Sequence, residues 1–401
     1  MVKVYTVVGA LWGDEGKGKF VNYLCNRNNA DIAVRFNGGS NAGHCIHTEE
    51  FGTVMFRTLP TGSTRPGTTA VLGNGMVIDP EFLLKEIKVV RAINPDFKLL
   101  VDKRAHLVLP IHQKADGNQD DERKQSIGTT RSGNGPAYSD KAFRAGVRVQ
   151  DLYRLNWELD NMLSAVVMRN GGGVEDLREL EKLSRKWREE LSDYVGDGSA
   201  HVNDAISEGA TVVFAGAQGV LLDIDHGDYP FVTSSNCIPA AVGTGAGVDP
   251  RRVDDVVGVV KAYSTRIGEG PLPTEIRDEE VAEHIRRQGN EYEIGVHIHR
   301  PRRIGWLDAE GLRRSARVCN YDYLAITLLD ALNGLERIEI PGVGTMPGWN
   351  ADISKAKSMD DLPTSMCEYI SEVENIAGCR VGLVSTGPHT DQVIDLRSEW
   401  R

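Results

Sequence analysis

The chain has 401 residues and a formal net charge of -11 at pH 7. This acidity excludes a protein that binds nucleic acid by broad charge neutralisation, but it leaves room for a local basic pocket that binds one nucleotide. No apolar run approaches the length of a membrane span, and the six cysteines form no Cys-x-x-Cys pair. The composition therefore predicts a cytoplasmic protein with reduced thiols, with small anions as partners and with neither nucleic acid nor membrane among them.

The first predicted strand, residues 4–9, leads into a glycine-rich loop. This loop contains the run Gly13-Asp14-Glu15-Gly16-Lys17-Gly18-Lys19, after which apolar residues recur at helical spacing. A strand, a glycine loop and a helix in this order leave backbone N–H groups free to hold a phosphate at the positive end of the helix. Phe20 replaces the Ser or Thr hydroxyl that binds magnesium in the usual phosphate loop. The carboxylates of Asp14 and Glu15 indicate a metal facing the phosphate or an acid/base role, whereas an acidic helix cap would explain only one of them.

A second flexible loop follows the next strand. Residues 32–36 form an apolar run that continues into a glycine-rich stretch ending at His44. A lone histidine is more often structural than functional. Its place at the end of such a loop, one strand away from Asp14, makes His44 a candidate acid or phosphate partner.

Further short apolar runs predict the buried strands of one sheet. They lie at residues 69–72, 99–101, 211–214, 256–260, 324–330 and 381–384. An amphipathic pattern over residues 174–195 predicts a helix that packs on the body of the protein. Every polar cluster follows a predicted strand, as expected for a ligand crevice at the carboxyl edge of an open α/β sheet.

Three further features suggest binding groups. Residues 127–136 are rich in hydroxyls and glycines and offer donors to an anion, with a surface turn as the alternative. Residues 297–303 are the most basic short segment, and His297 and His299 in it could bind a metal. Because no third ligand is in view, an arginine loop that binds carboxylates is the better interpretation, and a solvated basic turn is the alternative. Asp330 ends a predicted strand, where a carboxylate can read the N1–H and 2-amino groups of guanine.

Together these segments resemble adenylosuccinate synthetases nearly from end to end. The motifs that carry the resemblance are residues 12–19, 41–44, 128–130, 216–219, 223–227, 233–236, 265–270, 305–308 and 385–388. Their order along the chain is more specific than any one of them. The resemblance implies an α/β fold like that of phosphate-loop NTPases, with a large, mostly parallel central sheet and flanking helices. It also implies a single domain over residues 1–401 with helical insertions at about 150–200.

The resemblance implies a two-step ligase. A nucleoside triphosphate, GTP or ATP, phosphorylates O6 of a 6-oxopurine monophosphate, and the amine of L-aspartate then displaces that phosphate at C6. Asp14 would take the N1 proton and help to hold Mg²⁺, with the carbonyl of Gly43 as a further ligand, and His44 would donate to the transferring phosphoryl group. A homodimer with shared active sites is implied as well.

The resemblance also implies binding roles for named residues. For the triphosphate these are Gly13, Glu15, Gly16, Lys17, Gly18, Lys19, Asp330, Ser385 and Gly387. For the acceptor nucleotide they are Asn41, Thr130, Arg144, Gln218, Thr233 and Ile267, with Arg144 reaching across the dimer interface to the neighbour's nucleotide. Arg300 and Arg302 would bind the carboxylates of aspartate.

Four departures from the family pattern bear on the substrates. His297-Ile298-His299 replaces Thr-Thr-Gly, Leu328 replaces a lysine common in bacteria, and Arg131-Ser132 replaces Gly-Arg. Residues 237–240 look more like phage 2-aminoadenylosuccinate synthetases, which convert dGMP on the route to diaminopurine DNA.

The acceptor therefore has two interpretations. The segment 237–240 slightly favours dGMP, which would place the protein in a host cytoplasm if a phage encodes it, and the many intact motifs favour the alternative, IMP. Asp14 is compatible with either base, because a carboxylate can accept from both N1–H and a 2-amino group. A phosphate-loop NTPase switch that makes no ligation product is a remote third interpretation.

Overall fold

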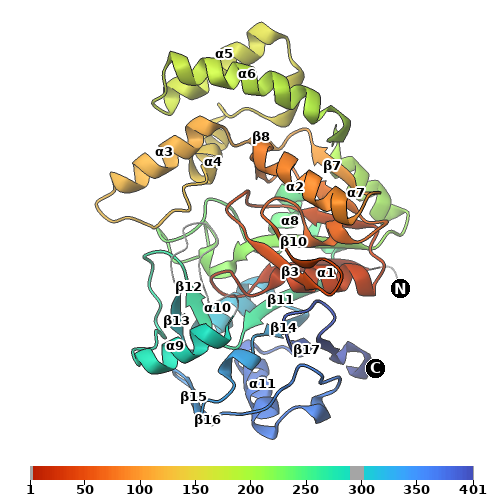
Figure 1. Ribbon diagram of the computed structural model, residues 1–401, viewed down its shortest axis with the longest axis vertical. Coiled ribbons are helices and arrows are strands. Elements are labelled where there is room, and N and C mark those ends of the chain that lie inside the picture. Colours follow the sequence, from red (N-terminus) through yellow and green to blue (C-terminus); the bar gives the residue numbers. More distant parts are fainter. Residues whose placement is uncertain (1–2, 290–301, 401) are drawn as a thin grey trace.

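A ten-stranded sheet forms the centre of the computed structural model, which describes residues 3–289 and 302–400 (Figure 1). Its order is β18-β17-β14-β11-β1-β10-β2-β5-β7-β9. Neighbouring strands are parallel except for β17 and β18, which are antiparallel. The strands are β1 (Val4–Gly9), β2 (Ile32–Arg35), β5 (Thr69–Leu72), β7 (Lys98–Asp102), β9 (Val195–Gly196), β10 (Val212–Gly219), β11 (Asp255–Lys261), β14 (Tyr323–Thr327), β17 (Val381–Ser385) and β18 (Val393–Asp395).

β1 shows how the middle of the sheet is buried on both faces. Val4 and Val8 belong to one apolar core and Tyr5 and Val7 to another, because successive side chains of a strand point to opposite faces. Helices supply the other side of each core: α1 (Lys17–Arg27) for the Tyr5 core, and α8 (Ala241–Ala246), α10 (Ala309–Cys319) and α11 (Thr364–Ala377) for the Val4 core. The predicted α/β fold with a large, mostly parallel sheet between helices is confirmed.

A third apolar core lies between β5, β7 and four helices drawn in the upper half of Figure 1: α2 (Pro80–Ile93), α3 (Pro110–Asp121), α5 (Asn156–Arg169) and α6 (Val174–Glu190). Two neighbouring helices pack elsewhere: α4 (Asn134–Phe143) places Ala137 in a small separate cluster, and α7 (Gly198–Ser207) places Val202 in the Val4 core. The helix predicted at 174–195 is α6, which ends earlier because residues 192–194 form a 3-10 turn before β9. The division of the chain into one domain with insertions stays a prediction.

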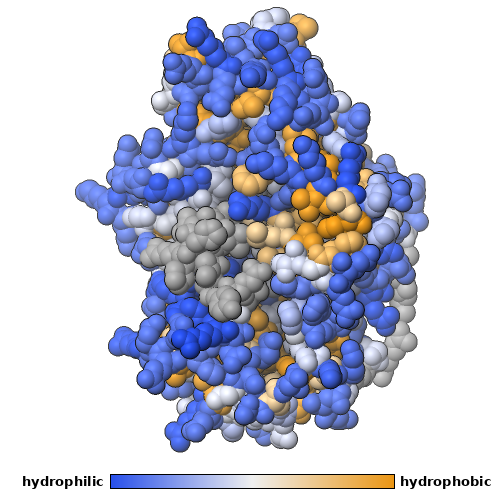
Figure 2. Space-filling model, in the orientation of Figure 1, coloured by the Kyte–Doolittle hydropathy of each residue, from blue (hydrophilic) through white to orange (hydrophobic). Residues whose placement is uncertain are grey.

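Short two-stranded sheets complete the fold. They pair β3 (His44–Thr48) with β4 (Gly52–Phe56), β6 (Val77–Ile78) with β8 (His106–Leu107), β12 (Ser264–Arg266) with β13 (Arg303–Gly305), and β15 (Arg337–Ile340) with β16 (Gly344–Pro347). The remaining helix of the described chain is α9 (Glu279–Gln288). The face seen in Figure 2 is mostly hydrophilic, with a group of hydrophobic residues to the right of its centre. None of the helices in the described ranges combines the length and the apolar character that crossing a membrane requires.

The carboxyl ends of the central strands position the loops that the sequence singles out. The segments that follow β1, β2, β14 and β17 all leave the same edge of the sheet. Two other polar segments do not lie where the sequence predicted. Residues 127–133 lie in the connection between α3 and α4, and residues 134–136 begin α4, so this segment does not follow a strand. Residues 216–219 form the last part of β10 and do not lie beyond its end.

Candidate active site

A cavity of about 710 Å³ opens at this edge of the sheet. Most of the predicted site residues line it: Gly13, Asp14, Gly16, Lys17, Gly18, Lys19, Asn41, Gly43, His44, Thr130, Gln218, Thr233, Ile267, Arg302, Asp330, Ser385 and Gly387. Glu15 and Arg144 are not among the lining residues. Arg300, His297 and His299 lie outside the described residues, so their predicted roles have no structural counterpart here.

The glycine loop turns tightly between β1 and α1. Gly13, Asp14 and Gly16 have φ angles of 88°, 59° and 82°, and Gly16 caps α1 without a side-chain hydrogen bond. Asp14 is thus a non-glycine residue in the left-handed region, a conformation that often marks a functional site. The first backbone N–H groups of α1 point out of the helix without a side-chain cap, which suits an anion.

Glu15 shapes this loop from the inside. Its carboxylate accepts hydrogen bonds from the backbone N–H of Gly13 at 2.8 Å and pairs with Nζ of Lys17 at 2.6 Å, and the side chain is only 1% exposed. A Cβ added at Gly9 or Gly219 would lie 2.3 or 2.7 Å from the carboxylate oxygens, so both glycines leave room for it. Of the two loop carboxylates, Asp14 alone faces the cavity.

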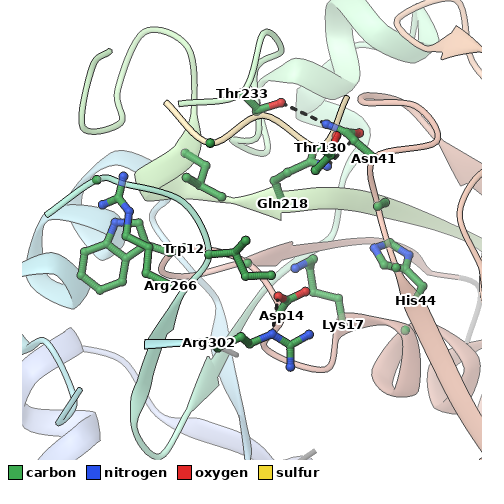
Figure 3. Close-up of a pocket in the computed structure, with 18 of the residues that line it drawn as sticks. Trp12, Asp14, Lys17, Asn41, His44, Thr130, Gln218, Thr233, Arg266 and Arg302 are labelled. Carbon is green, nitrogen blue, oxygen red and sulfur yellow. Dashed lines mark hydrogen bonds and ion pairs between the residues drawn. The ribbon is translucent and has the colours of Figure 1, made fainter. Parts of the chain in front are cut away.

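Arg302, which directly precedes β13, contacts Asp14 in the wall of the cavity. Its Nε lies 3.0 Å from Oδ2 of Asp14, and its side chain is 5% exposed (Figure 3). The arginine predicted to bind the carboxylates of a substrate therefore contacts a carboxylate of the protein. This pair places the predicted aspartate subsite directly beside the predicted base.

His44 begins β3 with its imidazole buried. Nη1 of Arg35, at the end of β2, lies 3.4 Å from Nδ1 of His44. Burial lowers the pKa of His44 well below its usual range, and the positive charges of Arg35 and Lys17 lower it further. His44 is therefore a neutral imidazole at physiological pH.

An amide and hydroxyl cluster forms the opposite wall, in the upper part of Figure 3. Nε2 of Gln218 donates to Oδ1 of Asn41 at 3.1 Å, and Nδ2 of Asn41 donates to the hydroxyl of Thr233 at 3.4 Å. The hydroxyl of Thr130 lies 2.6 Å from that of Ser132. Gln218 has a φ of 58°, a second left-handed residue in the wall of the cavity. These uncharged donors and acceptors suit a sugar phosphate and a purine edge.

Buried carboxylates hold the loops of this wall in place. The carboxylate of Asp223 accepts from the backbone N–H groups of Asp225 and His226 at 2.9 and 3.1 Å, and also from that of Cys237. The motif at 223–227 thus fixes the loop that carries Thr233 and does not itself enter the cavity. From α3, Asp116 and Asp120 bind the loop that carries Thr130, through the hydroxyl of Thr129 at 2.8 Å and the N–H of Ile127 at 2.9 Å.

Sequence reasoning missed several residues that line or support the cavity. Asp116 and Asp120 are acids at i and i+4 just before a donor-rich loop, which is a signal that could have identified them. Trp12 and Arg266 also line the cavity (Figure 3). Both bind Oδ2 of Asp228, at 2.8 and 2.9 Å. No local sequence pattern predicts the contact between Trp12 and Asp228, because the two residues lie more than two hundred positions apart.

The far end of the cavity is built by α1, β14 and β17. Nζ of Lys19 donates to the hydroxyl of Ser385 at 2.7 Å and to the carbonyl of Gly387 at 2.6 Å. Burial lowers the pKa of Lys19 to about 7, against the opposing effect of the nearby Asp330 carboxylate, and burial raises the pKa of Asp330. Leu328 has a φ of 58° and turns the chain from β14 toward Asp330. Lys19 thus ties the glycine loop to the 385–387 loop.

The segment that suggested a dGMP enzyme lies behind the cavity wall. Residues 237–240 are absent from the lining, and Cys237 is 1% exposed. Its Sγ lies 3.6 Å from the carbonyl of Ser235, and burial raises the pKa of the thiol. This segment is linked to the acceptor wall through the backbone that carries Thr233 and through Asn37, which donates to Sγ of Cys237 at 3.7 Å and accepts from the N–H of Ala217 at 2.8 Å.

Known proteins share both the sequence and the fold. The family model of adenylosuccinate synthetase matches residues 6–344 and 341–394. The adenylosuccinate synthetase of Thermodesulfovibrio yellowstonii is 39% identical over 97% of both chains, and that of Ligilactobacillus salivarius is 40% identical over 98% of both.

Two solved structures have the same fold. Fully ligated adenylosuccinate synthetase from Plasmodium falciparum has a TM-score of 0.90 at 32% identity, covering 98% of this chain and 99% of the other. The succinoaminodeoxyadenylate synthetase of cyanophage S-2L, solved with dGMP and dATP, has a TM-score of 0.68 at 20% identity, covering 98% and 95%, a likeness of fold alone. From the family match and the relatives at 39–40% identity, the chain belongs to the adenylosuccinate synthetase family and is a C–N-forming ligase.

Proposed function

We propose that the protein joins L-aspartate to C6 of IMP, with GTP as the phosphoryl donor and Mg²⁺ as the cofactor. The observation that carries this proposal is the single cavity in which Asp14, His44 and Arg302 meet a phosphate-type loop and an uncharged wall. A base, a hydrogen-bond donor and a carboxylate-binding cation are the groups that the two steps require.

The first step transfers a phosphoryl group to O6 of the purine. Asp14 accepts the N1 proton, electron density moves to O6, and O6 attacks the terminal phosphorus of the triphosphate while the nucleoside diphosphate leaves. His44 donates a hydrogen bond to the charge that develops on the transferred group. In the second step the aspartate amine forms the N–C6 bond and phosphate leaves with the former O6.

The residues present fit Mg²⁺. The Asp14 carboxylate and the Gly43 carbonyl would hold it, since Mg²⁺ prefers oxygen ligands and completes its shell with substrate phosphates and water. Both Asp14 and Gly43 line the cavity beside the glycine loop. When bound, the ion neutralises charge on the phosphates.

The contact between Arg302 and Asp14 supports a role for aspartate at this place. A substrate carboxylate offers the guanidinium the same kind of partner as Asp14 does, in a bidentate geometry. Aspartate that binds Arg302 would therefore release Asp14 toward the purine. The sequence resemblance assigns a second guanidinium to the aspartate, that of Arg300, which lies outside the described residues.

IMP is supported over dGMP by two observations. The relatives at 39–40% identity are adenylosuccinate synthetases, and the segment 237–240 that favoured dGMP does not line the cavity. The test offers the purified protein IMP, GMP and dGMP, each with aspartate and with GTP or ATP, and measures succinylated products by mass spectrometry. We expect product from IMP and GTP to exceed the others at least tenfold. Preferred use of dGMP would reverse the assignment of the acceptor.

The placement of Arg144 supports a homodimer. Arg144 follows α4 with a φ of 65°, is exposed, and lies away from the cavity of its own chain. It is therefore available to a neighbouring subunit, as the shared-site proposal requires. The six free cysteines support a reducing location such as the cytoplasm.

A further inference from the structure

Arg35 is a buried cation without a carboxylate partner. It is 0% exposed, and among the described residues none of the ion pairs involves it. Other shielded arginines of this chain do have carboxylate partners: Arg266 pairs with Asp228 at 2.9 Å and Arg397 with Asp395 at 2.6 Å. The carboxylate of Glu86 attracts Arg35 electrostatically but forms no ion pair with it, so the hydrogen bonds of the guanidinium go to uncharged groups.

The contacts of Arg35 point to His44. Nη1 of Arg35 lies 3.4 Å from both Nδ1 of His44 and the carbonyl oxygen of Arg57, while its Nε and Nη2 have no hydrogen-bond partner. The carboxylate of Glu86 attracts Arg35 from beyond ion-pair distance, and its oxygens accept the backbone N–H groups of Arg57 at 2.5 Å and Leu59 at 2.9 Å.

A guanidinium can donate hydrogen bonds but cannot accept them. Nδ1 of His44 therefore acts as the acceptor in the contact with Arg35, and in a neutral imidazole the proton then resides on Nε2. His44 lines the cavity while Arg35 does not, so the ring separates the cation from the substrate space. The guanidinium therefore lies behind the ring and holds Nδ1 as an acceptor, which leaves Nε2–H as the donor.

We propose that Arg35 is a positioning residue that fixes His44 as the Nε2–H tautomer, so that the imidazole donates to the phosphoryl group during its transfer. This proposal rests on the proposed function for the identity of the acceptor of that hydrogen bond. The tautomer itself does not depend on turnover.

The variants R35M and R35K test the proposal. Methionine keeps the length of the side chain without its charge, and lysine restores a donor. We expect R35M to lower kcat at least tenfold while KM for each substrate changes less than threefold, and R35K to recover part of kcat. The matched control is R104M, because Arg104 binds Asp102 and Asp197 away from the cavity; it should keep kcat within twofold.

A double-mutant cycle separates action through His44 from a merely structural role. In an H44A background, R35M should lower kcat less than twofold further, because the ring on which Arg35 acts is gone. An undiminished tenfold effect in that background would overturn the proposal. If R35M does not fold, R35Q takes its place in the same cycle.

Nitrogen NMR of histidine-labelled protein, with H44A to assign the signal, reads the tautomer directly. In the wild type we expect Nε2 of His44 to carry the proton, and in R35M a mixture of tautomers. A proton on Nδ1 in the wild type would refute the proposal even if the enzyme is fully active. Absence of turnover with the expected tautomer would instead count against the proposed function.

Discussion

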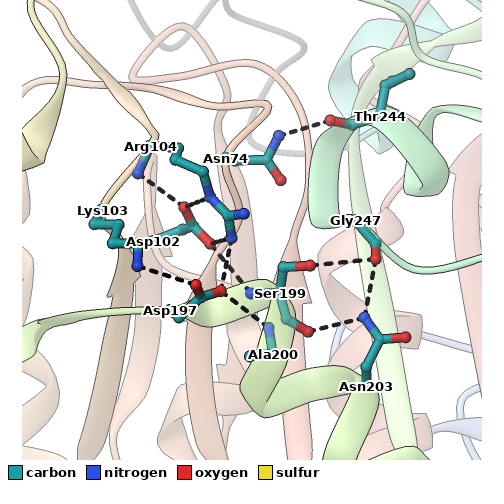
Figure 4. A network of polar contacts seen from close by, with 10 residues as sticks. All are labelled: Asn74, Asp102, Lys103, Arg104, Asp197, Ser199, Ala200, Asn203, Thr244 and Gly247. Atoms are coloured by element: carbon teal, nitrogen blue, oxygen red, sulfur yellow. Dashed lines mark hydrogen bonds and ion pairs between the residues drawn. The ribbon is translucent and has the colours of Figure 1, made fainter.

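Two polar regions at the carboxyl edge of the same sheet differ in whether their groups have partners. Figure 4 shows the region beyond β7, where Asp102 accepts from Nε of Arg104 at 2.9 Å and from the N–H of Ser199 at 3.1 Å. There the amide of Asn203 also donates to the carbonyl of Gly247 at 2.9 Å. In the cavity beyond β1 and β10, by contrast, Oε1 of Gln218 and both polar atoms of Asn134 have no partner among the described residues.

This difference distinguishes polar groups that stabilise the fold from polar groups that remain available to a ligand. Buried polar groups in folded proteins are nearly always hydrogen-bonded, so a concentration of unpartnered groups indicates a place completed by a ligand. The β7 region joins β7 to α7 and α8, and none of the buried side-chain polar atoms of the residues drawn there lacks a partner in the described part of the chain. The cavity has donors and acceptors left over, and it also contains the left-handed residues Asp14, Gln218 and Leu328.

The largest expected effect is that of D14N. Loss of the general base should lower kcat by roughly 10²–10⁴-fold, while the melting temperature changes little because Asp14 is 30% exposed and contributes one ion pair. Steady-state kinetics and thermal melts measure the two effects. Residual activity within tenfold of the wild type would remove Asp14 from the role of base.

The matched change in the other region is D102A. Asp102 is 0% exposed and accepts several hydrogen bonds, so its loss should lower the free energy of unfolding by about 1–3 kcal/mol. Urea denaturation measures this loss, and kcat and KM should stay within twofold. A selective loss of activity would show that the distinction between the two regions fails.

His106 in β8 makes stability depend on pH. Burial, with help from Lys141 and Arg148, lowers its pKa to about 4, whereas an unfolded chain has a histidine pKa of about 6.5. Between these values the unfolded state binds a proton that the folded state does not, so stability falls as pH decreases from 6.5 to 4, by at most about 1.4 kcal/mol per pH unit. The urea midpoints at pH 7 and pH 5 should differ less in H106N than in the wild type. An identical difference in both proteins would show that His106 does not cause the pH dependence of stability.

The smallest expected effect is that of C237A on the choice of acceptor. Because Cys237 lies behind the wall, its truncation should change the ratio of kcat/KM for IMP and dGMP less than twofold, with some loss of stability from the small cavity. A change of this ratio above tenfold would show that the segment 237–240 helps to select the acceptor nucleotide.

Much of the fold was readable because its signals are local. The apolar runs at 4–9 and 69–72 coincide with β1 and β5, since strands buried on both faces need unbroken apolar sequence. The hairpin of β3 and β4 was not predicted, because Gly52–Phe56 has only two buried residues and lacks such a run. His44 therefore begins a strand that sequence reasoning treated as the end of a loop.

The sequence predicted which residues form the candidate site, but it did not predict which way their side chains point. The run 13–19 identified a phosphate loop, yet only the fold shows that Glu15 turns inward and that Lys19 reaches the 385–387 loop. The role of Arg35 behind His44 is equally invisible in sequence, because it depends on the register between β2 and the hairpin that follows.

The most direct test of the proposed ligase uses IMP labelled with ¹⁸O at position 6, together with GTP, aspartate and Mg²⁺. If the cavity transfers a phosphoryl group to O6 before aspartate attacks C6, the label must leave with the released phosphate, one labelled phosphate for each succinylated product. Mass spectrometry of the phosphate reads this outcome. Unlabelled phosphate, or phosphate released at full rate without aspartate, would contradict the two-step ligation assigned to this site.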